Sequence, residues 1–148
     1  MTRVLFIGLF LVAGCSAATP PPPPVNAPET VSPRHLAALH GSFRQSHRGR
    51  PPKDEAEFKE YIKGLGEGRL ASLGIANLQV DALFVSPRDG QPYEVRYNDA
   101  APAAGGKGPP AVVVERVGKD GKRMVAYSTL QVEEIDDAQY QKVRFSKS

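Results

Sequence analysis

Residues 111–128 read AVVVERVGKDGKRMVAYS and decide the fold of this chain. The stretch holds two apolar runs rich in valine, and a polar, glycine-containing segment, 118–121, separates them. Within that segment the Asp120-Gly121 pair favours the tight turns that join antiparallel strands. The stretch therefore predicts a β-hairpin of strands 111–117 and 122–128.

Two further strands are predicted beside this hairpin. Residues 92–97 alternate, which places Tyr93, Val95 and Tyr97 on one face and Glu94 and Arg96 on the other. After a loop at 98–110 and the hairpin, residues 130–135 form the last predicted strand. A short helix then carries Tyr140 and Val143, and either Asp136 or Asp137 can cap it.

The first half of the chain predicts helices. Ser32 and Pro33 suit the start of a helix whose apolar positions recur at helical spacing, namely Leu36, Leu39, His40, Phe43 and His47. Gly49, Pro51 and Pro52 end it. A second helix begins at the capping pair Asp54 and Glu57 and carries Phe58, Tyr61, Ile62 and Leu65 on its apolar face. Residues 64–80 predict only helical turns and loop.

Helices followed by an antiparallel meander give an α+β class. We expect N-terminal helices packed on a small antiparallel sheet of three to four strands. With 148 residues, 41% hydrophobic and 24% charged, the chain is long enough for one folded domain. Its net charge of +3 is too small to indicate a nucleic-acid partner.

The N-terminus predicts export. Arg3 precedes an apolar run, 4–13, that as a helix rises only about 15 Å, roughly half of a membrane's hydrocarbon thickness. Val12-Ala13-Gly14-Cys15 resembles the lipobox of bacterial lipoproteins. The resemblance implies that the signal is cut before Cys15 and that Cys15, the only cysteine, carries the lipid. An ordinary secretory signal with a chance cysteine is the alternative.

This gives three expected segments: a signal peptide at 1–14, a lipidated cysteine with a disordered proline-rich linker at 15–31, and a globular domain at 32–148. The five prolines 20–24 favour an extended polyproline II spacer, and the linker reaches on the order of 50 Å. A proline tract can also be a ligand for aromatic-lined grooves. Ser16 after the cysteine is similar to lipoproteins that are sorted to the outer membrane and face the periplasm.

Two stretches of the folded part carry a further resemblance. Residues 86–93, SPRDGQPY, lead into a strand, and residues 120–127, DGKRMVAY, are followed by Val132-Glu133-Glu134-Ile135. Together they resemble pilin-like or pseudopilin-like domains of planctomycete-type lipoproteins. The chain departs from true pilins because a lipobox and a proline linker stand in place of the apolar assembly helix. Ser128-Thr129-Leu130 replaces a second Asp-Gly pair found in many relatives, so no loop function is carried over.

Residue patterns for catalysis or metal binding are weak. His40 and His47 lie about 10 Å apart along one helix, too far to chelate one ion alone. The acidic residues 133, 134, 136 and 137 point to different faces, and the glycines and lysine of 105–108 lack the setting of a phosphate loop. There is no nucleophile elbow. We expect no enzyme activity, no cofactor and no metal.

One basic cluster is a candidate contact surface: Arg44, Arg48, Arg50 and Lys53. These cations complement the C-terminal end of the first helix, which is a purely structural explanation. As a binding surface they suit an anionic partner such as a headgroup, a wall polymer or an acidic protein.

Two functions follow from these patterns. The first is a lipid-anchored cell-envelope structural or interaction protein without catalysis, held to the membrane by its lipid and binding an envelope protein or anionic polymer. The alternative is an envelope enzyme or ligand-binding lipoprotein whose site assembles from distant residues such as Arg88, Tyr93, Tyr97 and Tyr127.

Overall fold

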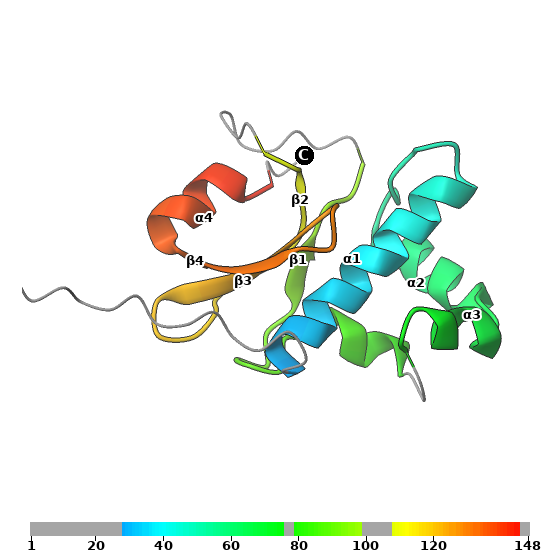
Figure 1. Cartoon of the computed structure of the whole chain (residues 1–148), viewed down its shortest axis with the longest axis horizontal. Helices are drawn as coiled ribbons and strands as arrows, with labels where there is room; N and C mark the ends of the chain where they lie inside the picture. The colour runs from blue at the N-terminus through cyan, green and yellow to red at the C-terminus, as the bar shows by residue number, and fades with distance from the viewer. Residues whose placement is uncertain (1–27, 76–78, 99–107, 146–148) are drawn as a thin grey trace, which may run out of the picture.

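The computed structural model describes residues 28–75, 79–98 and 108–145. Over these ranges the chain is α+β, as predicted, and its four strands form one antiparallel sheet in the order β1-β2-β3-β4 (Figure 1). In chain order the elements are α1 (Pro28–Ser46), α2 (Glu55–Gly64), α3 (Glu67–Ser72), the 3-10 helix η1 (Val80–Phe84), β1 (Tyr93–Val95), β2 (Ala111–Glu115), β3 (Lys122–Tyr127), β4 (Val132–Asp136) and α4 (Asp137–Val143). The expected signal peptide, Cys15 and the prolines 20–24 lie outside the described residues, as does most of the 98–110 loop.

The first helix begins earlier than the sequence predicted. α1 starts at Pro28 instead of Ser32 and Pro33, so residues 28–31 are helical rather than part of the linker. Proline at the first helical position loses nothing, because its missing N–H would have no partner there. Pro33 then lies inside the helix, at the cost of one backbone hydrogen bond, and its ring is fully buried.

The second helix agrees with its sequence signal. The Asp54 side chain accepts a hydrogen bond from the Glu57 backbone N–H at 2.9 Å and so caps α2. Phe58 and Ile62 are fully buried, and α2 packs against α1 and η1. The helical turns predicted within 64–80 include α3 and the start of η1.

The predicted hairpin is present with shorter strands. Val113 pairs with Ala126, and Val114 pairs with Val125. At the turn, the backbone groups of Lys119 and Lys122 exchange two hydrogen bonds of 2.9 Å. Asp120 and Gly121, between them, have φ angles of 53° and 74°, as the two-residue turn favoured by Asp-Gly requires.

Helices cover both faces of the sheet, so all five residues of β2 are buried. A register shift between Ala111 and Val113 gives β2 a bulge. Val112 and Val113 both join the core formed with α1 and α2, whereas Ala111 and Val114 join a smaller core beside α4. In Figure 1 the sheet accordingly lies between α4 and α1.

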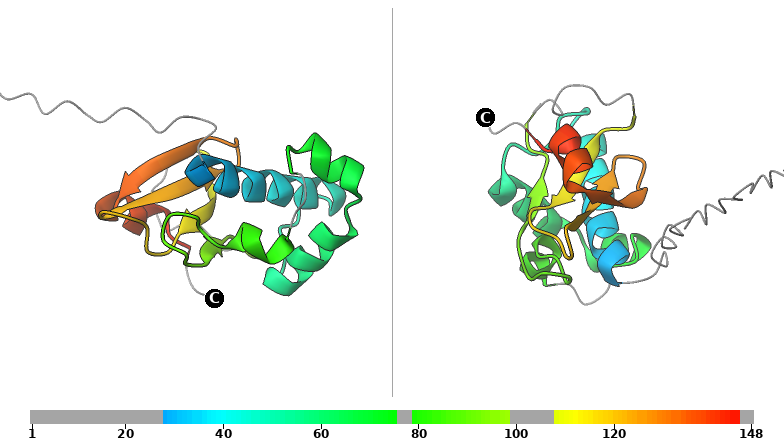
Figure 2. Two further views of the ribbon diagram at one scale, coloured as in Figure 1. Left: turned by 90° about the horizontal axis from the view of Figure 1, so that it is seen from below. Right: turned by 90° about the vertical axis from the view of Figure 1, so that its left-hand side faces the viewer.

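The other strands follow the same division. Tyr93, Val95 and Tyr97 belong to the α1 core, as the alternation predicted, and Ile135 belongs to the α4 core. α1 contacts β2, β3 and β4, and the left view of Figure 2 shows it running along the molecule beside the sheet. β4 begins at Val132, two residues later than predicted, because Leu130 has a φ of 65° and belongs to the turn. α4 has its capping box at Asp136 and Gln139, which decides between the two predicted caps.

Candidate functional site

The basic cluster surrounds the turn that ends α1. The backbone N–H of Gly49, at a φ of 88°, donates to the carbonyl oxygen of Arg44 at 2.7 Å. In return the Arg44 Nε donates to the Gly49 carbonyl oxygen at 2.8 Å. Arg48 is exposed and has a φ of 56°, and Lys53 is also exposed. The turn therefore holds Arg44 in place and presents Arg48 to solvent.

Arg50 differs from the other members of the cluster because it is paired. Its guanidinium donates to both carboxylate oxygens of Glu57, at 2.7 and 3.1 Å. These bonds, with that from the Lys53 backbone N–H, lower the pKa of Glu57 to about 2. Arg50 also lies over the Phe43 ring, 5.4 Å from its centroid. Its role is to join the end of α1 to α2.

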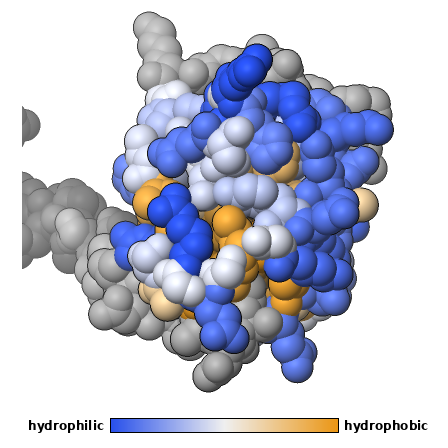
Figure 3. Space-filling model, turned by 90° about the vertical axis from the view of Figure 1, so that its right-hand side faces the viewer, coloured by the Kyte–Doolittle hydropathy of each residue, from blue (hydrophilic) through white to orange (hydrophobic). Residues whose placement is uncertain are grey.

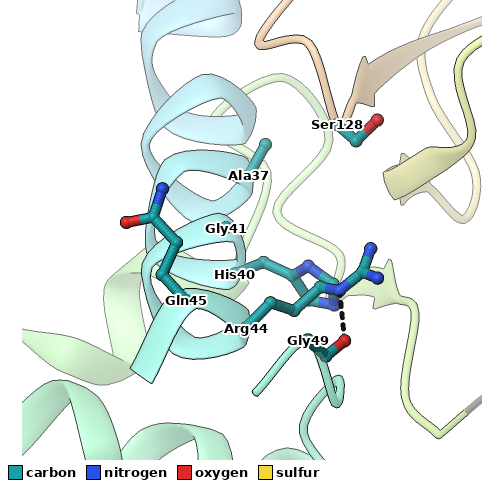
Figure 4. Close-up of a pocket in the computed structure, with 7 residues that line it drawn as sticks. All are labelled: Ala37, His40, Gly41, Arg44, Gln45, Gly49 and Ser128. Carbon is teal, nitrogen blue, oxygen red and sulfur yellow. Dashed lines mark hydrogen bonds between the residues drawn. The ribbon is translucent and has the colours of Figure 1, made fainter. Parts of the chain in front are cut away.

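A groove of about 320 Å³ lies beside this turn (Figure 4). It is open to solvent, and α1, the turn after it and the β3–β4 turn form its walls. None of its lining residues is a carboxylate: Ala37, His40, Gly41, Arg44, Gln45, Gly49 and Ser128. The groove was not predicted, since Ser128 is far from α1 in the sequence and only the folded chain brings the two together.

His40 forms the inner wall of the groove and is only 2% exposed. Its Nε2 lies 3.0 Å from the carbonyl oxygen of Arg96, just after β1. Burial lowers the pKa of His40 to about 4, and the charges of Arg44 and Arg96 contribute to the lowering. His40 is therefore neutral at neutral pH and donates its Nε2–H to Arg96. The positive charge around the groove comes from the arginines.

Arg96 is a residue that the sequence placed only on the polar face of a strand. The structure brings its backbone against α1, since the carbonyl oxygen of Arg96 lies 3.0 Å from the Nε2 of His40. The bond from its backbone N–H to Val112, 2.9 Å long, holds this part of the chain against β2. The sequence could not predict this position, because it depends on a contact between α1 and the end of β1.

The four residues named for the alternative site do not all come together. Tyr93 and Tyr97 pack in the α1 core, but Tyr127 packs against the α4 core on the other side of the sheet. Arg88 lies with Glu115 and Glu134 instead, at 3.5 and 2.8 Å. The hydroxyls of Tyr93 and Tyr97 are buried, and burial raises the pKa of Tyr93 to about 12.

The group around Glu115 is the most buried polar cluster that the structure describes. Glu115 is 1% exposed and accepts hydrogen bonds from the Ser86 hydroxyl and from the Met124 backbone N–H. Ser86 in turn accepts the Arg88 backbone N–H at 3.1 Å. These bonds tie the 86–93 loop to β2 and β3, so this stretch of the pilin-like resemblance has a structural role here.

His40 and His47 both contact aromatic rings. His40 meets Phe58 edge to face, and His47 stacks on Phe43 with ring centroids 3.9 Å apart. Within the described ranges, no group of three or more histidine, cysteine or acidic residues could hold a metal ion. Among the helices of the same ranges, none combines the length and the apolar character needed to cross a membrane.

Comparison with known proteins adds no further assignment. The chain has no significant match to a protein-family model, a curated protein or a solved structure.

Proposed function

We propose that this protein is a lipid-anchored interaction protein of the cell envelope that binds an anionic partner and performs no catalysis. The observation that carries the proposal is the groove on α1, where Arg44 forms part of the wall and no lining residue is acidic. Arg48 and Lys53 extend the positive surface along the following turn. Arg50 does not belong to it, since Glu57 neutralises its charge.

The side of the molecule formed by α2 and α3 is also mainly polar (Figure 3). On the side formed by α2 and α3, hydrophilic residues dominate and apolar areas are small (Figure 3). Stable, purely apolar interfaces need larger continuous patches. This side therefore does not compete with the arginine-lined groove as an apolar contact surface.

The anchor is the second part of the proposal. The lipobox-like Val12-Ala13-Gly14-Cys15 supports lipid attachment at Cys15, and Ser16 supports sorting to the outer membrane, facing the periplasm. From Cys15 to the start of α1 there are 13 residues, which reach about 40 Å if extended as polyproline II. The domain can thus meet partners near its own membrane. Helices followed by an antiparallel meander are the feature that supports a pilin-like domain.

Lipid attachment is tested by Cys15→Ser in the full chain. The substituted protein should remain unprocessed or move to the soluble fraction, because several acyl chains are needed for stable membrane binding. Incorporation of a labelled fatty acid into the original chain, lost in Cys15→Ser, is the expected result. A mature chain that begins elsewhere, or no incorporation at all, contradicts the anchor.

Partner binding is tested by recovery from solubilised envelope. We expect the double variant Arg44→Gln/Arg48→Gln to recover at least about tenfold less partner, since charge-assisted hydrogen bonds contribute roughly 1.5–3 kcal/mol each. The matched control is Arg116→Gln/Arg144→Gln, which removes the same charge from exposed arginines outside the groove. Binding should weaken with added salt. Equal recovery by both double variants, at low and high salt alike, would contradict the proposal.

A further inference from the structure

Several hydrogen-bond donors around the groove have no acceptor among the described residues. The Nε of Arg44 is bonded to Gly49, which orients the guanidinium and leaves its two Nη groups without a partner among the described residues. Within the same residues, the side chains of Gln45 and Ser128 also form no hydrogen bond, although both line the groove. Figure 4 shows Arg44 and Ser128 on opposite sides of the space over Gly41. Residues that carry unused donors thus stand on more than one wall.

The space itself lies over a glycine. A Cβ placed at Gly41 would meet nothing within 4 Å, so this helical position leaves open room instead of close packing. Glycine inside a helix costs about 1 kcal/mol relative to alanine. Because Gly41 lies in the body of α1 and at no positive φ, helix geometry does not require a glycine there. The absence of a side chain at Gly41 instead keeps the groove open.

The arginine charges at the groove favour an anionic ligand. Arg44 is permanently charged and lines the groove, while Arg48 lies on the adjoining turn. Carboxylates accept hydrogen bonds in one plane, whereas phosphate oxygens accept from several directions. Donors on different walls, with no acidic residue among them, match the tetrahedral group.

We infer that the groove binds a phosphate group of an envelope component, with the Nη groups of Arg44 as the principal contact and the backbone over Gly41 as its floor. This inference rests on the proposed function and names the chemistry of the partner. The phosphate can belong to a lipid headgroup or to a soluble or polymeric phosphate ester, and the experiment separates these sources.

The test is titration of inorganic phosphate into the full-length chain in a non-ionic detergent, followed by NMR of the backbone amides. We expect saturable shifts at Gly41, Arg44 and Gly49, and an affinity at least about tenfold lower in Arg44→Gln. Arg144→Gln, which loses the same charge beyond α4, should bind as the original chain does. Sodium chloride and sodium acetate at matched ionic strength control for screening and for carboxylate binding.

A second pair of variants tests the groove without changing charge. Gly41→Leu fills the space and should abolish the saturable shifts, while its helix remains folded because leucine is a better helix former than glycine. Gly68→Leu, at another helical glycine where an added Cβ would meet nothing within 4 Å, should leave binding unchanged. Circular dichroism verifies that each variant is folded.

The same backbone amide signals, recorded in lipid nanodiscs, distinguish the two sources of the phosphate. If phosphatidylglycerol nanodiscs shift them without added phosphate, the ligand is a headgroup; if only glycerol phosphate does so, it is a free or polymeric ester. Equal shifts with acetate, or unchanged binding in Gly41→Leu, would overturn the inference. If phosphate fails while Arg44→Gln/Arg48→Gln still loses the envelope partner, the proposed function stands and the partner is another acid.

Discussion

The carboxylate of Glu115 accepts the backbone N–H of Met124 on the neighbouring strand at a distance of 2.7 Å. Backbone pairing between β2 and β3 has its last regular pair there at Val114 and Val125. The side chain of Glu115 therefore supplies the acceptor for the next N–H of β3. Ser86 and Arg88 bring the loop before β1 to the same carboxylate, so one buried charge joins three segments.

Removing this carboxylate should strongly lower the free energy of unfolding of the domain. Glu115→Leu removes the acceptor of the Met124 N–H and of the Ser86 hydroxyl, and it removes one ion-pair partner of Arg88. Breaking a buried pair costs about 3–5 kcal/mol. Urea unfolding followed by circular dichroism measures the loss. Glu133→Leu, at an exposed position of β4, is the control and should cost less than about 1 kcal/mol. Similar losses in the two variants would show that the Glu115 cluster does not stabilise the fold.

Gly118 should tolerate no side chain. It has a φ of 78°, and a Cβ there would overlap the carbonyl oxygen of Lys122. Gly90 has a φ of 68° but open space around it, so it separates backbone strain from steric overlap. We expect Gly90→Ala to lower the free energy of unfolding by about 1 kcal/mol and Gly118→Ala by about 3 kcal/mol. Equal effects would mean that the β2–β3 turn is not as tight as described.

The two faces of β1 should respond differently to substitution. Val95 is 6% exposed in the α1 core, so Val95→Asp buries a carboxylate and should cost about 4 kcal/mol or more. Glu94, on the other face, accepts a hydrogen bond from the Tyr140 hydroxyl at 3.2 Å, which a glutamine can also accept. Glu94→Gln should therefore cost less than about 1 kcal/mol. Comparable drops in melting temperature would show that the register of β1 is misassigned.

Local patterns predicted much of this fold. The alternation around Val95, the cap at Asp54 and the turn at Asp120-Gly121 each depend on neighbours in the sequence, and the structure has all three. The predicted start of α1 was wrong because Pro33, taken as the first helical residue, lies in the second turn of a helix that begins at another proline, Pro28. The complete burial of β2 was missed because it depends on helices packing on both faces, and one of them, α4, follows much later in the chain.

The candidate site was predictable only in part. Arg44 and Arg48 stood out as cations near a helix end, but the sequence could not show that Glu57 takes Arg50 out of the cluster. That pair joins residues across a turn whose shape depends on Arg48 and Gly49 at positive φ. The contribution of Arg96 and Ser128 depends on long-range packing of β1 and of the β3–β4 turn against α1, which no local pattern records.

His40 should make the stability of the domain fall in mild acid. Its pKa is about 4 in the fold, chiefly because it is buried, and 6.5 is the ordinary value that applies when the chain is unfolded. Between these two values the unfolded chain binds the proton and the folded chain does not. Stability is therefore full above about pH 7 and declines as the pH falls toward 4, by a total on the order of 3 kcal/mol.

His40→Gln tests this assignment, because a glutamine can still donate to the Arg96 carbonyl oxygen but does not titrate. The free energy of unfolding, measured by urea at intervals from pH 7.5 to 4.5, should fall less steeply in His40→Gln than in the original chain. Burial also lowers the pKa of His35, and its contribution is common to both chains and cancels in the difference. Parallel pH profiles for the two chains would mean that the folded domain accepts the proton on His40 without cost, and that the imidazole is not enclosed between α1 and the end of β1.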